Sequence, residues 1–337
     1  MAVQQFVLRD FELESGETLP EAVLAYATYG ELDPGRGNAI VFPTWFAGTH
    51  ESNEWLIGPG RPLDTDRYFV IVPNTFGNGL SSSPSNTAAP FDGPRFPRLT
   101  MRDNVEAQYR LVTEHFGIGR LALVLGCSMA AVQTYQWAVD HPEMVRRALP
   151  YCGAPRTPAH GRVFVDGLRA ALTAPLNGAG DRTAAESRSA LETFARVFAS
   201  WGFSQAFHRQ EAYRELGFDS AEETTSGFWI ANFAGLDVDN VLSQLDTWIT
   251  ADISRGPRFG GDLPAALGAI DAQLVSLACD TDLYFPPEDE EAAAAHLRNG
   301  KALTIHSVWG HQAGGGADPV GAEIIGEQTR RLLDATV

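Results

Sequence analysis

The stretch 121–139, LALVLGCSMAAVQTYQWAV, places one serine between two kinds of apolar pattern. Residues 121–125 form a short continuous apolar run, which is typical of a buried strand. Residues 131–139 form a pattern typical of a helix. A strand, a sharp turn with Ser128 at its apex and a following helix lift a serine hydroxyl above the edge of a sheet. The stretch therefore predicts an α/β fold in which Ser128 is a nucleophile.

The sharp turn restricts the residues around Ser128. We expect it to strain the backbone of Ser128, so that the residues two positions away must be small, as Gly126 and Ala130 are. The helix that starts beside Ser128 adds free N–H groups and a dipole, both of which favour negative charge there. Cys127 is the alternative nucleophile, but it precedes the apex, where a side chain points toward the interior.

Composition excludes several classes of function. The 337 residues carry 25 basic and 42 acidic side chains, a formal net charge of −17, which argues against nucleic-acid binding. No apolar stretch reaches the length of a membrane span, and residues 1–10 lack the pattern of a secretory signal, so we expect a soluble cytoplasmic protein. The three cysteines lack metal-ligand spacing and are expected to be buried reduced thiols; no metal and no cofactor is expected.

The order of patterns along the chain predicts a mostly parallel central sheet with helices on both faces. Residues 1–154 are expected to form the first part of the core, 155–260 a helical lid insertion, and 261–337 the last part of the core. The predicted strands are 6–14, 21–29, 39–43, 68–72, 121–125, 145–152, 272–279 and 302–308. The predicted core helices are 102–116, 131–139, 288–298 and 321–333.

Residues 155–260 show helical patterns without a strand between them. The expected helices are 164–173, 188–201, 204–216, 221–234 and 238–253. Such a block, inserted between core strands, is most simply a lid over the active site. An added structural subdomain with no gating role is the alternative.

A serine hydroxyl needs a base to take its proton, and the base needs an acid to fix its tautomer. Asp280 and Asp282 follow the strand that ends at Cys279, and both are candidates for the acid on position alone. His311 follows the next strand and is the candidate base, whereas His306 lies within a strand pattern. The order serine, aspartate, histidine is that of α/β hydrolases.

An oxyanion that develops on the substrate needs two backbone N–H donors. Met129, directly after the serine, is expected to supply one of them. The loop 44–48 is expected to supply the other from Phe46, with Trp45 as the neighbour that could replace it. The side chains of Trp45 and Phe46 are expected to line the substrate pocket.

With these residues placed, the chain resembles the homoserine O-acetyltransferase family of α/β-hydrolase-fold proteins nearly end to end. Ser128-Met129 with the following Gln133 and 137–139 is similar to the family's nucleophile strand and helix, and Gly310-His311 to its histidine segment. The segment 282–287, DLYFPP, is similar to the family's catalytic aspartate segment, and this resemblance selects Asp282 over Asp280. The resemblance also implies that the helical insertion is a lid that contributes to a homodimer.

The departures from the family bear on its substrate. Cys127, Ala130 and Ala131 stand where family enzymes have glycines, and the loop 73–83 is only partly similar. Family enzymes have an aspartate directly after the histidine, which helps to hold the amino group of homoserine. Gln312 occupies that place in the pocket here and pairs less strongly with an ammonium.

These residues support three readings of function. The first is hydrolysis of an ester of a small molecule through an acyl-Ser128 intermediate, and the loss of the carboxylate beside His311 favours it. The second is transfer of the same acyl group to an alcohol, with an acyl-CoA as co-substrate. The third, a non-catalytic binding protein, would require a missing triad member, and none is missing.

Overall fold

A single eight-stranded sheet forms the centre of the protein, and the computed structural model describes residues 3–174 and 182–335. The strand order is β1-β2-β4-β3-β5-β6-β7-β8. The strands are β1 (Gln4–Glu12), β2 (Thr18–Tyr29), β3 (Ala39–Val41), β4 (Phe69–Pro73), β5 (Leu123–Cys127), β6 (Arg147–Tyr151), β7 (Gln273–Cys279) and β8 (Gly300–Ile305).

Most of this sheet is parallel, as predicted. Strands β1 and β2 pair antiparallel with each other, and β2 pairs antiparallel with β4. From β4 to β8 every neighbouring pair is parallel. The strands β3, β4, β5 and β6 are buried at every residue, because helices cover both faces of a parallel sheet. This explains why β3, β4 and β5 are continuous apolar runs rather than alternating ones, whereas β6 begins with a charged residue, Arg147.

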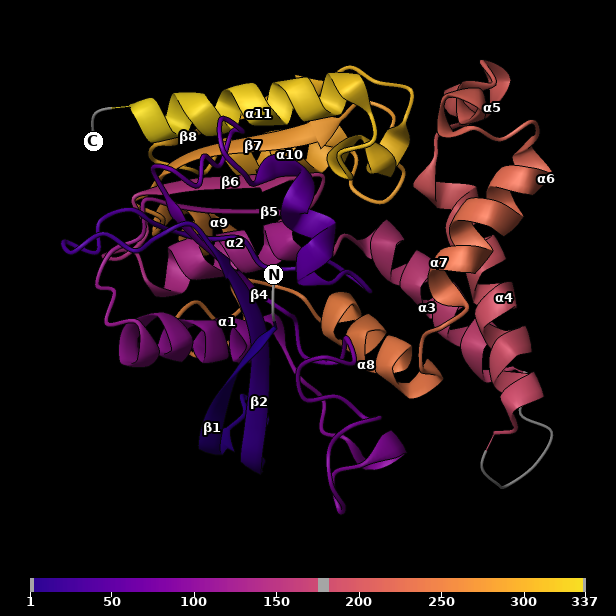
Figure 1. Cartoon of the computed structure of the whole chain (residues 1–337), viewed down its shortest axis with the longest axis horizontal. Helices are drawn as coiled ribbons and strands as arrows, with labels where there is room; N and C mark the ends of the chain where they lie inside the picture. The colour runs from indigo at the N-terminus through magenta and orange to yellow at the C-terminus, as the bar shows by residue number, and fades with distance from the viewer. Residues whose placement is uncertain (1–2, 175–181, 336–337) are drawn as a thin grey trace.

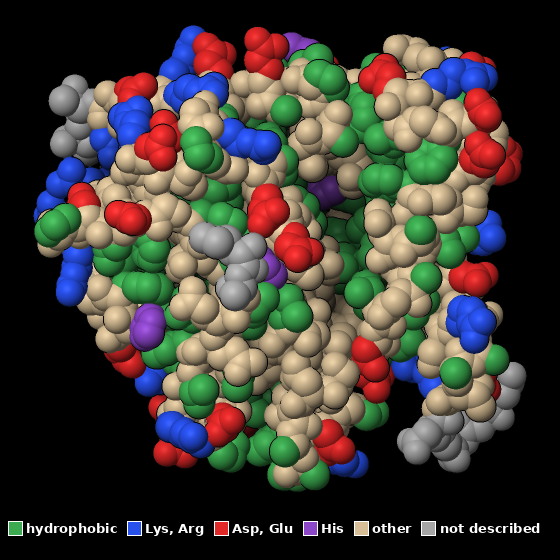
Figure 2. All heavy atoms as spheres, in the orientation of Figure 1, with side chains coloured by type: hydrophobic (Ala, Val, Ile, Leu, Met, Phe, Trp, Pro, Cys, Tyr) green, Lys and Arg blue, Asp and Glu red, His purple; other side chains and the backbone are tan. Residues whose placement is uncertain are grey.

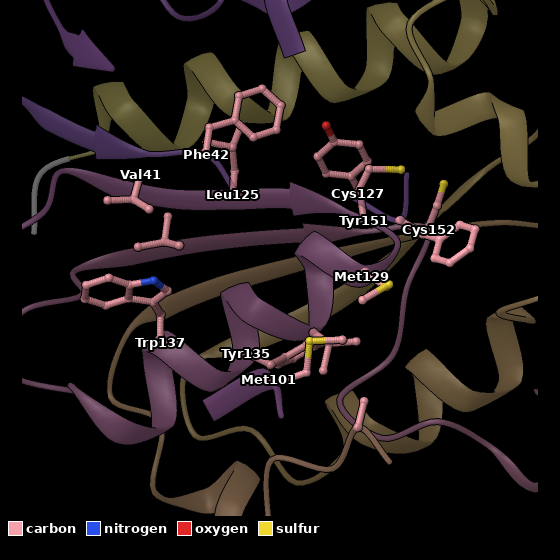
Figure 3. Close-up of a cluster of buried hydrophobic side chains, with 14 of the residues drawn as sticks. Val41, Phe42, Met101, Leu125, Cys127, Met129, Tyr135, Trp137, Tyr151 and Cys152 are labelled. Atoms are coloured by element: carbon pink, nitrogen blue, oxygen red, sulfur yellow. The ribbon is translucent and has the colours of Figure 1, made fainter. Parts of the chain in front are cut away.

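Core helices pack on both faces of the sheet (Figure 1). Helix α11 (Pro319–Asp334) lies on one face, and α1 (Met101–Arg110) and α2 (Met129–Asp140) lie on the other. Helix α10 (Pro287–Ala294) contacts α2, since Tyr135 donates a hydrogen bond to Glu290 at 2.6 Å. The short helix α9 (Leu263–Gly268) precedes β7. Figure 3 shows the side chains of Tyr135 and Trp137 on α2 within this core.

Between β6 and β7 the chain forms a separate helical layer, which lies beyond the carboxyl ends of the parallel strands (Figure 1). Its long helices are α3 (Ala159–Thr173), α4 (Ala184–Gly202) and α8 (Val238–Ile249). Shorter helices complete it: α5 (Gln205–Arg209), α6 (Ala221–Thr224) and α7 (Ala231–Phe233). Figure 2 shows a hollow between this layer and the sheet, with a histidine inside it. A gating role and a homodimer contact for the layer stay predictions.

Most predicted elements differ from the observed ones by some residues at their ends, and three of the differences bear on the argument. The expected helix 204–216 is divided into α5 and a 3-10 helix, η4 (Ala212–Leu216), because Glu211 between them adopts a left-handed conformation with φ 54°. The expected helix 221–234 contains a π-helical segment, η5 (Thr225–Ile230). Strand β8 ends at Ile305, so that His306 lies beyond the strand rather than within it.

Further short helices lie in the connections of the core. They are the 3-10 helices η1 (His50–Leu56), η2 (Gly93–Arg95) and η6 (Gly310–Gly314), and the π-helical segment η3 (Leu111–His115) that extends α1.

Candidate active site

Ser128 lies at the junction of β5 and α2 with φ 57° and ψ −121°. A residue with a side chain in this conformation is strained by about 1–3 kcal/mol and persists only where its surroundings hold it. Its N–H donates to the carbonyl of Tyr151 at 3.0 Å, which fixes the turn to β6. A Cβ at Gly126 would lie 2.5 Å from the carbonyl oxygen of Ala130, so position 126 requires glycine. The strain and the need for small neighbours agree with the prediction from the sequence.

His311 and Asp282 form a buried pair beyond the ends of β8 and β7. His311 Nδ1 lies 2.8 Å from Asp282 Oδ2, and their side chains are 9% and 0% exposed. Asp282 Oδ1 accepts backbone hydrogen bonds from Tyr284 at 2.8 Å and Phe285 at 3.2 Å. An ionised carboxylate can only accept, so this contact favours the neutral tautomer with the proton on Nδ1, which presents Nε2 as the acceptor.

The loop that carries His311 is fixed to the helical layer and to the neighbouring loop. Gly310 has φ 61°, and a Cβ there would lie 2.9 Å from the backbone nitrogen of Ser204. Ser204 in turn donates its hydroxyl to the carbonyl of Val308 at 2.6 Å. The N–H of Gly310 donates to the hydroxyl of Thr281 at 3.1 Å. Residues of two loops and the helical layer therefore position the imidazole.

Ser128 and His311 line one cavity of about 340 Å³. No hydrogen bond joins Ser128 Oγ to His311 in the described part of the chain, and catalytic hydrogen bonds of this kind often tighten only in the complex with substrate. Of the described residues that line the cavity, none but the histidine has an acidic or basic side chain. Its lining residues are Trp45, Phe46, Ala47, Gly48, Ser52, Cys127, Ser128, Phe198, Phe228, Trp229, Asn232, Phe233, Trp248, His311, Gln312 and Gly315.

Aromatic side chains from the helical layer form one wall of the cavity. The ring of Phe46 stacks on Phe198 with centroids 5.7 Å apart and an interplanar angle of 15°. Its centroid lies 5.8 Å from that of Trp248 and 6.4 Å from that of Phe233. Each of these four side chains is less than a tenth exposed. The apolar wall is therefore shared between the loop 44–48 and helices α4, α7 and α8.

The loop 44–48 is held by the sheet on one side and by the helical layer on the other. The N–H of Thr44 donates to the carbonyl of Pro73 at 3.2 Å. The N–H of Ala47, which has φ 58°, donates to Gln244 Oε1 on α8 at 2.8 Å. In the described part of the chain the N–H groups of Phe46 and Met129 have no acceptor, and neither has that of Trp45. Both predicted oxyanion donors are thus free for a ligand, and so is the alternative.

The remaining sequence candidates are divided between the cavity and the surface. Trp45 and Gln312 line the cavity, as does Cys127, which is 4% exposed. Figure 3 shows Cys127 and Cys152 at the ends of neighbouring strands. Asp280 and His306 do not line the cavity; they pair with each other at 2.8 Å on the surface.

Two buried glutamines that support the site were not assigned this role from the sequence. Gln133 on α2 donates to the carbonyl of Thr44 at 3.2 Å and accepts from Gln108 at 2.6 Å. Gln244 binds Ala47, which is 197 positions away in the chain. No local pattern assigns this supporting role to either residue, because both act through contacts between distant segments. Asn232 and Ser52 also line the cavity without a sequence signal.

Two further kinds of feature are absent from the described residues. No cluster of three or more His, Cys, Asp or Glu side chains in residues 3–174 and 182–335 is arranged to hold a metal ion. Within the same ranges no helix has both the length and the apolar character needed to cross a bilayer.

Comparison with known proteins agrees with this geometry. Residues 38–166 match the family described as alpha/beta hydrolase fold. An ethyl acetate hydrolase from Pseudomonas veronii is 39% identical over 302 residues, covering 89% of this chain and 86% of the relative. A homoserine O-acetyltransferase from Leifsonia xyli subsp. xyli is 32% identical over 363 residues, covering 96% and 88% respectively.

A solved structure extends the agreement to three dimensions. The acetylester hydrolase from Corynebacterium glutamicum superposes with a TM-score of 0.95 at 34% identity, covering 99% of this chain and 96% of that chain. Fold, length and sequence all agree with enzymes that hydrolyse esters or transfer acyl groups. The chain belongs to the homoserine O-acetyltransferase-like family of the α/β-hydrolase superfamily and is an enzyme of that fold.

Proposed function

We propose that the protein hydrolyses short-chain esters of small uncharged alcohols, with Ser128 as nucleophile, His311 as base and Asp282 as its partner. The observation that carries this proposal is the lining of the cavity at Ser128, where no side chain is acidic and one wall is aromatic. Such a cavity suits an uncharged substrate, because an ion would lose its hydration there without gaining a counter-ion. Relatives named ethyl acetate hydrolase and acetylester hydrolase support the same substrate class.

Acylation begins when Ser128 Oγ attacks the carbonyl carbon of the ester and His311 Nε2 takes the hydroxyl proton. The carbonyl oxygen becomes an oxyanion, which accepts from the N–H groups of Met129 and Phe46. Asp282, held by two backbone N–H groups, stabilises the imidazolium. The tetrahedral intermediate then expels the alcohol, which receives the proton from His311 Nε2, and an acyl-Ser128 ester remains.

Deacylation repeats the sequence with water. His311 Nε2 takes a proton from a water molecule as that water attacks the acyl carbonyl, and the second oxyanion occupies the same two N–H groups. Collapse of this intermediate returns the proton to Ser128 Oγ and releases the carboxylic acid. The cycle needs no cofactor, and an acyl-CoA would enter only as a co-substrate of the alternative reaction.

The aromatic wall limits the acyl group. Phe46 lies in the loop 44–48 and is a proposed oxyanion donor through its N–H, while its ring is packed against Phe198 and Trp248. A long acyl chain would have to displace buried rings from three elements, which packing at interior density resists. Acetyl and propionyl esters are therefore the proposed substrates.

Acyl transfer to homoserine is the second candidate, since a relative with that name is 32% identical. Homoserine carries an ammonium group, which a buried site recognises best with a carboxylate. Gln312 supplies only an amide to this cavity, and no acidic side chain lines it. Hydrolysis is favoured for this reason.

The experiment is to incubate the protein with ethyl acetate and p-nitrophenyl acetate, and separately with acetyl-CoA with and without L-homoserine. We expect acetate release from both esters and no homoserine-dependent release of thiol. Ser128→Ala should abolish ester hydrolysis and labelling by a serine-directed phosphonate, whereas Cys127→Ala should keep both. Thiol release that requires homoserine would instead establish the transferase.

Gln312→Asp sharpens the distinction between the two reactions. We expect this variant to gain homoserine-dependent turnover relative to wild type without faster ester hydrolysis, because only the ammonium benefits from the added charge. Efficient homoserine acetylation by wild type that Gln312→Asp leaves unchanged would contradict the hydrolase proposal.

A further inference from the structure

A second cavity, of about 540 Å³, lies where the parallel strands begin, at the opposite edge of the sheet from Ser128. It is formed by the segment before β3, the segment before β5 and the start of β6. Its ten lining residues are Gly35, Arg36, Gly37, Gly117, Gly119, Arg120, Leu121, Ala122, Arg146 and Arg147. The site proposed for ester hydrolysis shares none of them.

The charge of this lining contrasts with that of the whole chain. Four of the ten lining residues are arginines and none is acidic. The whole chain has 25 basic and 42 acidic residues, so its net charge is negative. A lining with four arginines and no acidic residue therefore has the opposite charge to the chain as a whole. Figure 2 shows basic side chains at the left edge of the molecule, where the parallel strands of Figure 1 begin.

Arg147 is the buried member of the group, at 8% exposure. Its terminal nitrogens donate to the carbonyls of Ala122 and Ala335, but its Nε has no partner among the described residues. Burial and the neighbouring Arg146 lower the pKa of this guanidinium. A buried N–H without an acceptor is destabilising, and an anion that reached this nitrogen would supply the missing acceptor.

The other arginines have donors to spare. Arg36 donates one terminal nitrogen to the carbonyl of Gly117 at 2.9 Å, which holds its side chain against another lining residue of the cavity. Arg120 and Arg146 are exposed and form no ion pair with any described residue. A guanidinium presents several N–H groups in a planar fork that matches the oxygens of phosphate.

The glycines of the lining leave room for a ligand. A Cβ placed at Gly37 or Gly119 would meet no atom within 4 Å, so the backbone there faces open space. Backbone without side chains allows a ligand to approach closely. The N–H of Gly37 already donates to Asp33 Oδ1 at 2.9 Å, so the room there serves close approach, and the arginines remain the donors to the ligand.

We propose that this cavity binds a small phosphate-bearing anion through Arg36, Arg120, Arg146 and Arg147. The spread of the four side chains over three segments suits an anion with more than one phosphate group. Because β5 separates the cavity from Ser128 by its full length, about 17 Å at the usual rise per residue, the bound anion is not the substrate. The proposal is independent of the activity proposed for Ser128.

Calorimetric titration with inorganic pyrophosphate tests the site in the full-length protein. The test variant is Arg120→Ala/Arg146→Ala, which removes two exposed side chains and spares the buried Arg147. The control is Arg188→Ala/Arg196→Ala, which removes the same charge from exposed positions of α4. We expect the test variant to bind pyrophosphate at least about tenfold more weakly and the control to match wild type.

Three outcomes would overturn the proposal. The first is the absence of pyrophosphate binding by wild type at millimolar concentration. The second is equal weakening in the test and control variants, which would mean that net charge alone attracts the anion. The third is tighter binding of citrate than of pyrophosphate, which would point to carboxylate rather than phosphate recognition. Circular dichroism of both variants checks that they are folded.

Discussion

Two aspartate–histidine pairs lie next to each other in this protein, and the same two connections supply both of them. Asp282–His311 and Asp280–His306 have the same Nδ1–Oδ2 distance, 2.8 Å. The side chains of the first pair are 9% and 0% exposed for histidine and aspartate, and those of the second are 80% and 37% exposed. A short distance between an imidazole and a carboxylate therefore does not by itself identify a catalytic pair.

The surroundings of the two pairs explain the difference. Asp282 accepts two backbone N–H groups, and the rings of Tyr284 and Phe285 lie 4.6 Å and 5.7 Å from that of His311. Water can reach Asp280 and His306, so their attraction is screened and each side chain keeps its freedom. Only the buried pair is held in one tautomer and one orientation beside a nucleophile.

The largest expected difference in activity is between variants of the two histidines. We expect His311→Ala to lower kcat/KM for p-nitrophenyl acetate by about 10⁵, because triad members act as a unit, whereas His306→Ala should stay within about twofold of wild type. Steady-state hydrolysis of the same ester by both variants measures this. A loss in His306→Ala comparable to that in His311→Ala would break the comparison.

Substitution of the two aspartates should also affect kcat unequally, with the larger loss again at the buried pair, but the difference should be smaller than for the histidines. We expect Asp282→Asn to lower kcat by about 10⁴, because an amide at this position favours the wrong tautomer of His311. Asp280 pairs with the exposed His306 and accepts the N–H of Ser307, which an amide oxygen can still accept, so Asp280→Asn should leave kcat unchanged. The matched pair of variants is compared on one ester at one pH, and equal losses would contradict the assignment of Asp282.

Glu290 is a third carboxylate, and it shows how burial changes the pKa of a carboxyl group that lacks the two backbone N–H donors of Asp282. Glu290 is buried, and its Oε2 accepts from Tyr135, but burial raises its pKa from 4.5 to about 7. Between these values the folded state holds a proton that the unfolded state has released. The free energy of unfolding therefore falls as pH rises from about 4.5 to 7, by about 3 kcal/mol from this group, and changes no further above it.

Glu290→Gln should remove this contribution. We expect the free energy of unfolding of wild type, relative to the variant, to fall by about 3 kcal/mol between pH 5 and pH 8. Urea unfolding of both proteins at the two pH values measures the difference, and the variant cancels the contributions of all other groups. Parallel pH dependence in the two proteins would show that Glu290 titrates normally.

The smallest expected effect is on stability at the surface pair. We expect Asp280→Ala to change the free energy of unfolding by no more than about 1 kcal/mol, since exposed ion pairs contribute little. Any change should shrink further in about 1 M salt, which screens exposed charges. Urea unfolding at low and high salt tests this. A salt-independent loss of several kcal/mol would mean that Asp280 stabilises the fold of its loop and does more than form an exposed ion pair.

The sequence predicted the fold because the decisive patterns are local. The apolar run before Ser128, the small residues Gly126 and Ala130, and the helix that follows can all be recognised within twenty positions. The order of serine, aspartate and histidine predicted which loops meet, since parallel strands end at one edge of the sheet. Position alone left Asp280 and Asp282 equivalent, because a loop's turn decides which of two near neighbours faces the interior.

What the sequence did not show depends on contacts between distant segments or on local breaks. Glu211 divides an expected helix by adopting a left-handed conformation. Glycine is the residue that usually marks such a position in a sequence, and position 211 is a glutamate. The end of β8 at Ile305 depends on where pairing with β7 stops, and Cys279 is its last partner. The binding of Gln244 to Ala47 needs the folded positions of both.

That last contact has a consequence for how such enzymes can be altered. Gln244 on α8 accepts the N–H of Ala47 and so holds the loop that carries Phe46. The helical insertion and the segment 44–48 therefore depend on each other and should be exchanged together. A chimera that receives a foreign insertion but retains its own loop would lose this hydrogen bond and the matched packing of Phe46 on Phe198 and Trp248. Recombination at the ends of the insertion should therefore succeed only when residues 44–48 are exchanged with it.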